Sequence, residues 1–148
     1  MAHSATVLVI DDDPEYRFAL CAMLAHHKLS VRQAADGWKA LHALRSDPVP
    51  DLICVDLMLP GISGFEICEI IRRDERLRDV PILVISARGH PQDVALATVA
   101  GANAYLPKTL RLRELAAHAV SLAQGNPAQP AEGAPAGGGG IPVEKAAP

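Results

Sequence analysis

The fold is set by residues 6–14, which read TVLVIDDDP. The first five residues are apolar and mostly β-branched, which is typical of a strand buried on both faces. Aspartate and proline commonly begin a helix, because a carboxylate caps the first turn and proline needs no hydrogen-bond acceptor there. The segment therefore predicts a buried strand, an acidic turn and a helix in direct succession.

The same alternation repeats along the chain. Apolar runs predict buried strands at 52–55 and 82–85, and weaker ones at 30–34 and 103–106, each followed by helical spacing of apolar residues. Such strands are typical of a parallel sheet covered on both faces. We expect an α/β fold, a doubly wound, flavodoxin-like sheet of five parallel strands in the order 2-1-3-4-5. The run at 30–34 is the least apolar and suits an edge.

A change of composition divides the chain of 148 residues after residue 124. Residues 125–148 are mostly alanine, glycine and proline, with four consecutive glycines at 137–140. This segment lacks the apolar side chains that would offset the entropy lost on ordering. We therefore expect one domain over residues 1–124 and a flexible tail or linker over 125–148.

The composition argues against several functions. The formal net charge is -3 and aromatic residues make up 3%, which disfavours direct nucleic-acid binding by this domain. No apolar run reaches the length of a membrane helix, and the first residues do not resemble a secretory signal, so we expect no membrane insertion. The three cysteines lie in apolar segments without a CxxC motif, which fits free buried thiols in the cytoplasm.

Polar side chains stand where the predicted strands end. Asp11 and Asp12 follow the first strand, Asp56 the third and Ser86 the fourth, while Lys108 comes just after the fifth. In a doubly wound sheet, ligands bind beyond the carboxyl ends of the strands, between the first and third. We therefore expect these side chains to gather around one crevice.

Clustered carboxylates need a compensating charge. Two of them about 4 Å apart repel by roughly 4 kcal/mol at an effective dielectric of 20, so the cluster either holds extra protons or binds a cation. Oxygen ligands without histidine or cysteine favour Mg²⁺. With Lys108 opposite the cation and the Ser86 hydroxyl as a donor, the site suits a phosphoryl group in transfer. Asp56 is the expected nucleophile, because it stands alone at the end of a central strand.

These segments resemble the receiver domain of two-component response regulators, and are similar to the stand-alone chemotaxis-type receivers. The resemblance covers about residues 6–122 and rests on VLVIDDDPEYR, AADGWKAL, PDLICVDLMLPGISGFEI, VPILVISA and GANAYLPK. It implies a phosphorylation-dependent switch rather than an enzyme, assisting only its own phosphoryl transfer and dephosphorylation. The implied partners are a sensor histidine kinase or phosphotransfer protein, and a downstream protein that the sequence does not identify.

The resemblance also implies how the phosphoryl site is built. Asp56 accepts the phosphoryl group from a kinase histidine. Mg²⁺ contacts Asp12 directly and Asp11 through water, and its other ligands are Asp56 and the backbone carbonyl of Met58. All of these ligands are oxygen atoms, as Mg²⁺ prefers.

A second set of residues carries the implied switch. Ser86 takes the switch hydroxyl position, Lys108 the invariant lysine, and Tyr105 the aromatic that turns inward as the hydroxyl moves toward the phosphate. Phosphorylated Asp56 gains negative charge and acceptor oxygens, which attract that hydroxyl. Thr109 stands where the family usually has proline after the lysine. A cis bond before threonine costs about 2.5 to 4 kcal/mol, so we expect a trans bond.

Other functions require residues that this sequence lacks at the corresponding positions. A phosphatase of the haloacid dehalogenase type needs an acid two residues after its nucleophile, where this chain has Met58. A nucleotide or flavin module needs a loop rich in glycine or hydroxyl residues after the first strand, where three acids stand instead. A receiver-like interaction module that is not phosphorylated stays open as the alternative. Arg111, Arg113 and Glu114 are too few charges to establish a dimer interface, and a homodimer also stays open.

Overall fold

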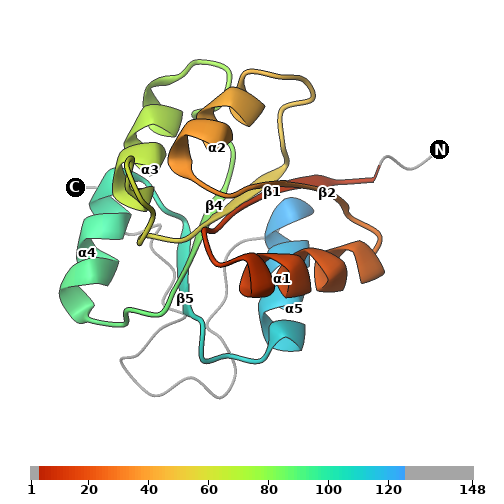
Figure 1. Ribbon diagram of the computed structural model, residues 1–148. Helices are drawn as coiled ribbons and strands as arrows, with labels where there is room; N and C mark the ends of the chain where they lie inside the picture. Colours follow the sequence, from red (N-terminus) through yellow and green to blue (C-terminus); the bar gives the residue numbers. More distant parts are fainter. Residues whose placement is uncertain (1–3, 126–148) are drawn as a thin grey trace.

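Strands and helices alternate strictly along residues 4–125, the part of the chain that this computed structural model describes (Figure 1). All strand pairs are parallel, and their order across the sheet is β2-β1-β3-β4-β5, which confirms the predicted topology. The elements are β1 (Thr6–Ile10), α1 (Pro14–His26), β2 (Ser30–Ala34), α2 (Gly37–Leu44), β3 (Leu52–Val55), α3 (Gly64–Arg73), β4 (Ile82–Ser86), α4 (Pro91–Ala100), β5 (Ala104–Pro107) and α5 (Leu112–Ala123).

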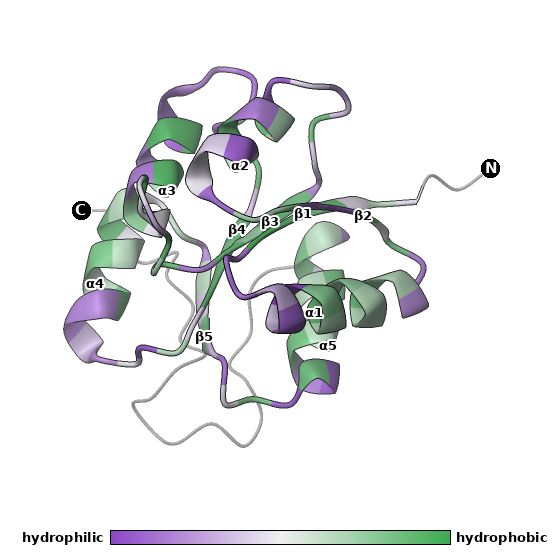
Figure 2. Ribbon diagram, in the orientation of Figure 1, coloured by the Kyte–Doolittle hydropathy of each residue, from purple (hydrophilic) through white to green (hydrophobic). Residues whose placement is uncertain are grey.

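Two apolar layers separate the sheet from its helices. Helices α1 and α5 cover one face, and α2, α3 and α4 cover the other (Figure 1). Strand β1 serves both layers, since Val7 and Val9 pack toward α1 and α5 while Leu8 and Ile10 pack toward the opposite helices. Figure 2 shows the hydrophobic colour along the central strands. A strand buried on both faces has no polar side, which explains its continuous apolar sequence.

The edge of the sheet carries its most polar strand. Strand β2 pairs with β1 alone, from Thr6 opposite Ser30 to Ile10 opposite Ala34, and most of its side chains are exposed or half-buried. An edge strand tolerates polar side chains because water reaches part of its surface. The prediction that residues 30–34 form an edge is therefore confirmed.

The helix boundaries follow local capping chemistry. The Asp13 carboxylate caps α1 by accepting hydrogen bonds from two backbone N–H groups of its first turn, and Pro14 is the first helical residue. Ser63 and Glu66 exchange the two hydrogen bonds of a capping box at the start of α3. Helix α4 ends at Gly101, whose φ of 116° lies in the left-handed region that glycine adopts without strain.

The three cysteines are free and buried, as predicted. Burial raises the pKa of Cys68 to about 12 and raises the pKa of Cys54 well above its ordinary value. Both thiols are therefore protonated near neutral pH and are poor nucleophiles.

Two further sequence predictions concern the C-terminal tail and membrane-spanning helices. From residue 126 onward, the predicted tail lies outside the described residues. Within residues 4–125, no helix has both the length and the apolar character that crossing a membrane would require.

The close packing of α3 against the end of β3 depends on Gly64. A Cβ atom on this residue would lie 2.3 Å from the carbonyl oxygen of Asp56 and 2.7 Å from the Cα of Leu57. These are backbone atoms, so the overlap could be relieved only by moving the end of β3 or the start of α3. Because Asp56 follows β3 directly, Gly64 also fixes the place of this predicted nucleophile.

We expect Gly64→Ala to lower the free energy of unfolding by at least about 3 kcal/mol, or to prevent folding, because its Cβ meets fixed backbone. Urea denaturation followed by circular dichroism measures the change. Gly89→Ala is the matched control, since nothing lies within 4 Å of a Cβ at that exposed position. Equal stability of the two variants would contradict the close approach of α3 to β3.

Candidate functional site

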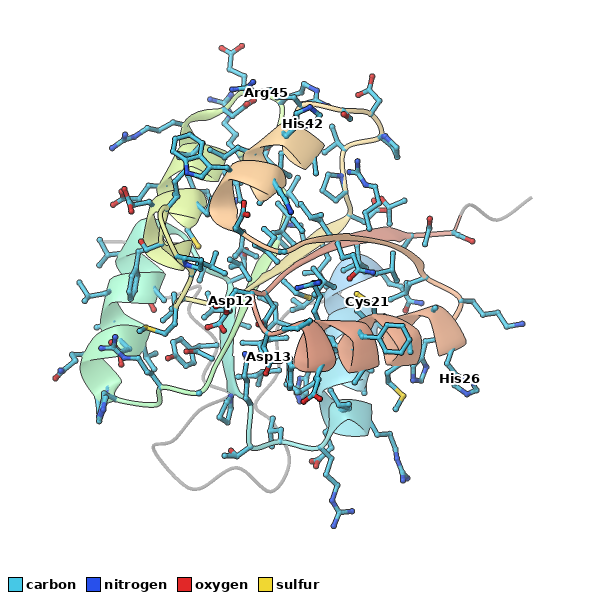
Figure 3. The ribbon with its side chains drawn as sticks, viewed as in Figure 1. Asp12, Asp13, Cys21, His26, His42 and Arg45 are labelled. Carbon is cyan, nitrogen blue, oxygen red and sulfur yellow. The ribbon has the colours of Figure 1, made fainter. Side chains whose placement is uncertain are left out.

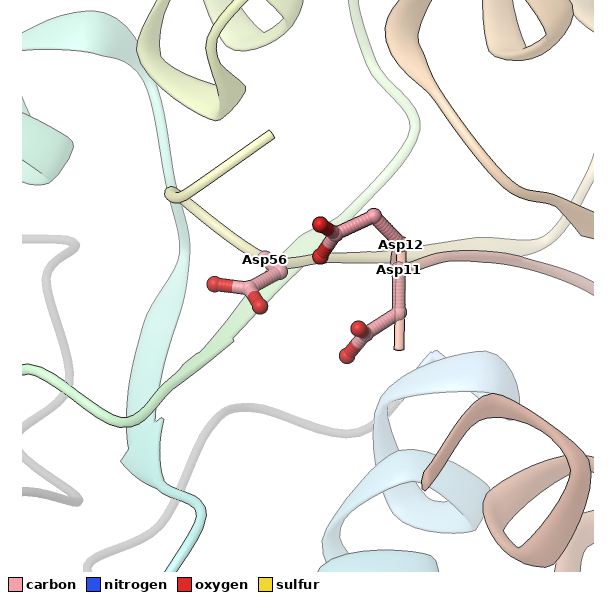
Figure 4. Close-up of side chains that lie close together, drawn as sticks. All are labelled: Asp11, Asp12 and Asp56. Carbon is pink, nitrogen blue, oxygen red and sulfur yellow. The ribbon is translucent and has the colours of Figure 1, made fainter. Parts of the chain in front are cut away.

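The carboxylates that follow β1 and β3 form one cluster. Asp11, Asp12 and Asp56 each offer an oxygen atom, and these oxygens lie within 4.8 Å of one another. Figure 4 shows the carboxylates of Asp11 and Asp12 pointing toward the side of Asp56. The two strands are neighbours, with Ile10 opposite Val55, so the residues that follow them must come close together. Within residues 4–125, no other group of three such side chains is placed to hold a metal ion.

The members of the cluster differ in burial. Asp11 and Asp56 are 3% and 5% exposed, whereas Asp12 is exposed. Burial raises the pKa of Asp11 above its ordinary value, and the hydrogen bonds from Lys108 and from the backbone of Asp13 lower it only in part. The cluster therefore holds more negative charge than its surroundings neutralise, which favours a bound cation.

Lys108 supplies the positive charge at this site. Its Nζ atom lies 2.8 Å from Oδ2 of Asp11 and 2.8 Å from Oδ2 of Asp56. Burial lowers the pKa of Lys108, but the two carboxylates outweigh burial and the pKa lies above its ordinary value. The ammonium group is therefore charged at neutral pH. Among the described residues the cis peptide bond is Asp47–Pro48, so the bond from Lys108 to Thr109 is trans, as predicted.

Backbone hydrogen bonds orient the two buried carboxylates. The N–H of Asp13 donates to Oδ1 of Asp11 at 2.9 Å, and the N–H of Met58 donates to Oδ1 of Asp56 at 3.1 Å. Arg17 donates from Nη1 to the backbone carbonyl of Asp11 at 2.8 Å. Each carboxylate thus presents its Oδ2 atom to Lys108 and is fixed through its other oxygen.

Ser86 and Tyr105 meet through the backbone of Arg88. Both side chains are fully buried. The N–H of Arg88 donates to Oγ of Ser86 at 3.2 Å, and the hydroxyl of Tyr105 donates to the carbonyl of Arg88. Burial raises the pKa of Tyr105 above its ordinary value, so its hydroxyl is neutral near pH 7. The ring is fully buried and thus already inward in this structure.

The side chain of Arg88 links this network to α4. Its Nε and Nη2 atoms donate to the two carboxylate oxygens of Asp93, at 3.2 and 2.9 Å, and its Nη1 lies 3.2 Å from Sδ of Met58. Asp93 is 2% exposed and lies in the first turn of α4, where the helix dipole favours a negative charge. The contact of Asp93 with Arg88 was not predicted from the sequence, because an acid in a first helical turn is too common to indicate a specific contact.

The structure brings the predicted site residues together at one edge of the sheet. Figure 3 shows Asp12 and Asp13 at the inner end of α1, while His26 lies at its far end and His42 lies out on α2. The carboxylate cluster thus has only oxygen donors beside the Lys108 ammonium. Oxygen-only donor sets suit hard cations such as Mg²⁺. The predicted role of the Met58 carbonyl as a ligand stays a prediction.

Residues 7–120 match the response regulator receiver domain. The DNA-binding dual master transcriptional regulator RpaA of Synechocystis sp. is 40% identical over 78% of this chain and 48% of its own length. The DNA-binding response regulator MtrA of Mycolicibacterium smegmatis is 36% identical over 85% of this chain and 54% of its own length. The chain therefore spans about half the length of these curated relatives.

Solved structures show the same fold. The chemotaxis protein CheY4 of Vibrio cholerae is 27% identical with a TM-score of 0.72, covering 76% of this chain and 93% of that one. A two-component response regulator from Clostridium difficile is 25% identical with a TM-score of 0.75, covering 82% of this chain and 97% of that one. These chains align along most of their length, so the fold is shared as a whole.

We expect the two halves of the Arg88–Asp93 pair to contribute unequally to stability. Arg88→Ala leaves the buried carboxylate of Asp93 without its cation, which costs about 2 to 4 kcal/mol of unfolding free energy. Asp93→Asn leaves a guanidinium that is 42% exposed and stays hydrated, so the loss is only about 1 kcal/mol. Urea denaturation of both variants measures the difference. Equal losses would contradict the buried character of Asp93.

Proposed function

The chain belongs to the receiver domain family of response regulators, and from that premise we propose that it is a phosphorylation-dependent switch of a two-component system. In this proposal Asp56 accepts a phosphoryl group from a sensor histidine kinase or a phosphotransfer protein. The observation that carries the proposal is the contact of Lys108 Nζ with both Asp11 and Asp56 at 2.8 Å. This contact places a fixed positive charge beside the nucleophile.

Mg²⁺ is the cofactor that the donor set fits. Asp11, Asp12 and Asp56 offer oxygen atoms within 4.8 Å of one another, and two of these carboxylates, those of Asp11 and Asp56, share the Lys108 ammonium group. We propose that these carboxylates and the carbonyl of Met58 hold the ion. A bound Mg²⁺ supplies charge neutralisation and coordination positions for phosphoryl oxygens.

The chain's own groups arrange the transfer. A carboxylate oxygen of Asp56 attacks phosphorus, the bond to the kinase histidine nitrogen breaks, and a bond from phosphorus to the Asp56 oxygen forms. The kinase phosphohistidine reacts with its other ring nitrogen protonated, so the electron pair of the broken bond stays on the ring nitrogen and the histidine leaves as neutral imidazole. Met58 N–H holds Oδ1 of Asp56, so the carboxylate cannot rotate freely. The Lys108 ammonium group lies beside Asp56, so it can stabilise negative charge first on the carboxylate and then on the phosphoryl oxygens.

Hydrogen bonds in the structure connect Ser86 with α4 and give a route for the proposed switch. A hydroxyl at Ser86 that turns toward a phosphorylated Asp56 must weaken its hydrogen bond with the N–H of Arg88, whose carbonyl accepts the hydroxyl of Tyr105. Arg88 in turn holds Asp93 at the start of α4. Phosphorylation therefore biases the arrangement of the β4–α4 loop and α4, and a partner that binds α4, β5 and α5 reads the outcome.

The role proposed for this domain is separate from the DNA binding named for the relatives. RpaA and MtrA are described as DNA-binding, but this chain corresponds to about half of each. The receiver domain is not a recognised catalytic enzyme family. We propose one domain over residues 1–124 that assists only its own phosphorylation and dephosphorylation, followed by a tail or linker over 125–148. The free buried cysteines favour the cytoplasm.

We expect Asp56→Asn to abolish labelling by a small phosphodonor in the presence of Mg²⁺, because an amide oxygen is not a competent nucleophile here. Mass spectrometry of the intact protein measures the acyl phosphate. Asp79→Asn, which changes an exposed acid at the amino end of the sheet, is the control and should be labelled like the unaltered protein. Labelling retained by Asp56→Asn would place the acceptor elsewhere. An unlabelled parent protein would favour an interaction module that is not phosphorylated.

We expect Asp12→Asn to weaken Mg²⁺ binding by about tenfold or more, since it removes an exposed charged ligand. Without metal the variant should unfold at the same or a higher temperature, because repulsion within the cluster falls. Thermal unfolding with and without saturating Mg²⁺ measures both effects. An equal rise in melting temperature for variant and parent would remove Asp12 from the proposed ligand set.

A further inference from the structure

Tyr16 presents the face of its ring to the ammonium group of Lys108. The Nζ atom lies 4.6 Å from the ring centroid, within the range of a cation–π contact. Tyr16 belongs to the first turn of α1, and its N–H donates to the Asp13 carboxylate that caps this helix. The ring therefore reaches Lys108 from an element that also carries the acidic turn.

The hydroxyl group of Tyr16 makes no contact that would account for a tyrosine at this position. It is buried and has no hydrogen-bond partner among residues 4–125. Burial raises the pKa of Tyr16 well above its ordinary value, so the phenol is neutral and cannot act as an anion beside Lys108. A buried hydroxyl without a partner lowers stability. The aromatic face is thus the part of the side chain with an identifiable contact.

The ring adds a restraint to those that Lys108 already has, which are two ion pairs and a backbone hydrogen bond from its N–H to the carbonyl of Ser86 at 2.9 Å. A lysine side chain is long and flexible, and its ammonium carries three donors. Strand β5 ends at Pro107, and the bond that follows Lys108 is trans, without a proline to stiffen the backbone. Two donors serve the carboxylates of Asp11 and Asp56. The ring attracts the ammonium without providing a hydrogen-bond acceptor that would compete with those oxygens or with a phosphoryl group.

We propose that Tyr16 is a positioning residue for phosphoryl transfer, whose ring face holds the Lys108 ammonium where it contacts both Asp11 and Asp56. This inference rests on the proposed function, because it takes Asp56 as the acceptor. Tyr16 acts through Lys108 and does not touch the reacting atoms itself. Loss of the ring lets the ammonium leave the acceptor carboxylate more often, which slows transfer.

Two substitutions separate the ring from the hydroxyl. Tyr16→Phe keeps the aromatic face and removes the unpartnered hydroxyl, whereas Tyr16→Leu removes the face. Phe18→Leu is the matched control, since Phe18 is an aromatic residue of the same helix that is 72% exposed. Tyr16→Met serves as a second variant without a ring if Tyr16→Leu fails to fold.

Nuclear magnetic resonance and phosphorylation kinetics give the two readouts. An aromatic face shifts the signals of protons above it upfield, so the ε-methylene protons of Lys108 report the contact directly. We expect this shift in the parent protein, Phe18→Leu and Tyr16→Phe, and its loss in Tyr16→Leu. The initial rate of phosphorylation by a small phosphodonor with Mg²⁺ should fall about tenfold in Tyr16→Leu and stay within about twofold in the others.

Each contrary outcome has a distinct meaning. A Tyr16→Leu variant that loses the upfield shift but keeps the parent rate overturns the positioning role. A Tyr16→Phe variant as slow as Tyr16→Leu assigns the effect to the hydroxyl and also overturns it. A parent protein that is not phosphorylated at all overturns the proposed function itself, whereas a phosphorylated parent with an unaffected Tyr16→Leu overturns only the role of Tyr16.

Discussion

The contact of one ammonium group with two buried carboxylates is the interaction on which the site depends. Lys108 follows β5, while Asp11 and Asp56 follow β1 and β3, so the contact ties together the ends of three strands. Buried carboxylates are costly without a cation, and a lysine with no acid nearby would be equally unfavourable at this depth. The parallel topology allows the lysine and the two carboxylates to pair, because all strands end at the same edge of the sheet.

The negative charge at this edge of the sheet exceeds the positive charge of Lys108, and the proposed chemistry depends on that excess. A third carboxylate, Asp12, stays exposed beside the buried pair. The cluster therefore suits a divalent cation, while Lys108 contacts Oδ2 of Asp56. The hydrogen bond from the Met58 N–H to Oδ1 of Asp56 leaves the proposed nucleophile oriented rather than free to rotate. The same carboxylates and the same ammonium group therefore affect both the stability of this edge and its proposed chemistry.

Arg88 connects the charge at Asp56 with the surface of the protein. Its backbone contacts Ser86 and Tyr105, and its side chain contacts Asp93 at the start of α4. A change in the hydrogen bonding of the Ser86 hydroxyl therefore acts on a loop that is already joined to a helix. The inward Tyr105 is packed in the core, so a shift of this network alters packing as well as hydrogen bonds.

The sequence by itself determined the strands, their topology and the carboxylate cluster. Strands β1, β3 and β4 are buried on both faces, so their apolar runs are unambiguous, and the rule that sites form at the carboxyl ends then places Asp56 beside Asp11. Two strand boundaries moved, from 82–85 to Ile82–Ser86 for β4 and from 103–106 to Ala104–Pro107 for β5. The tertiary structure alone decided the pairing of Arg88 with Asp93 and the contact of Tyr16 with Lys108. Such contacts depend on side-chain directions from separate elements, which periodicity does not encode.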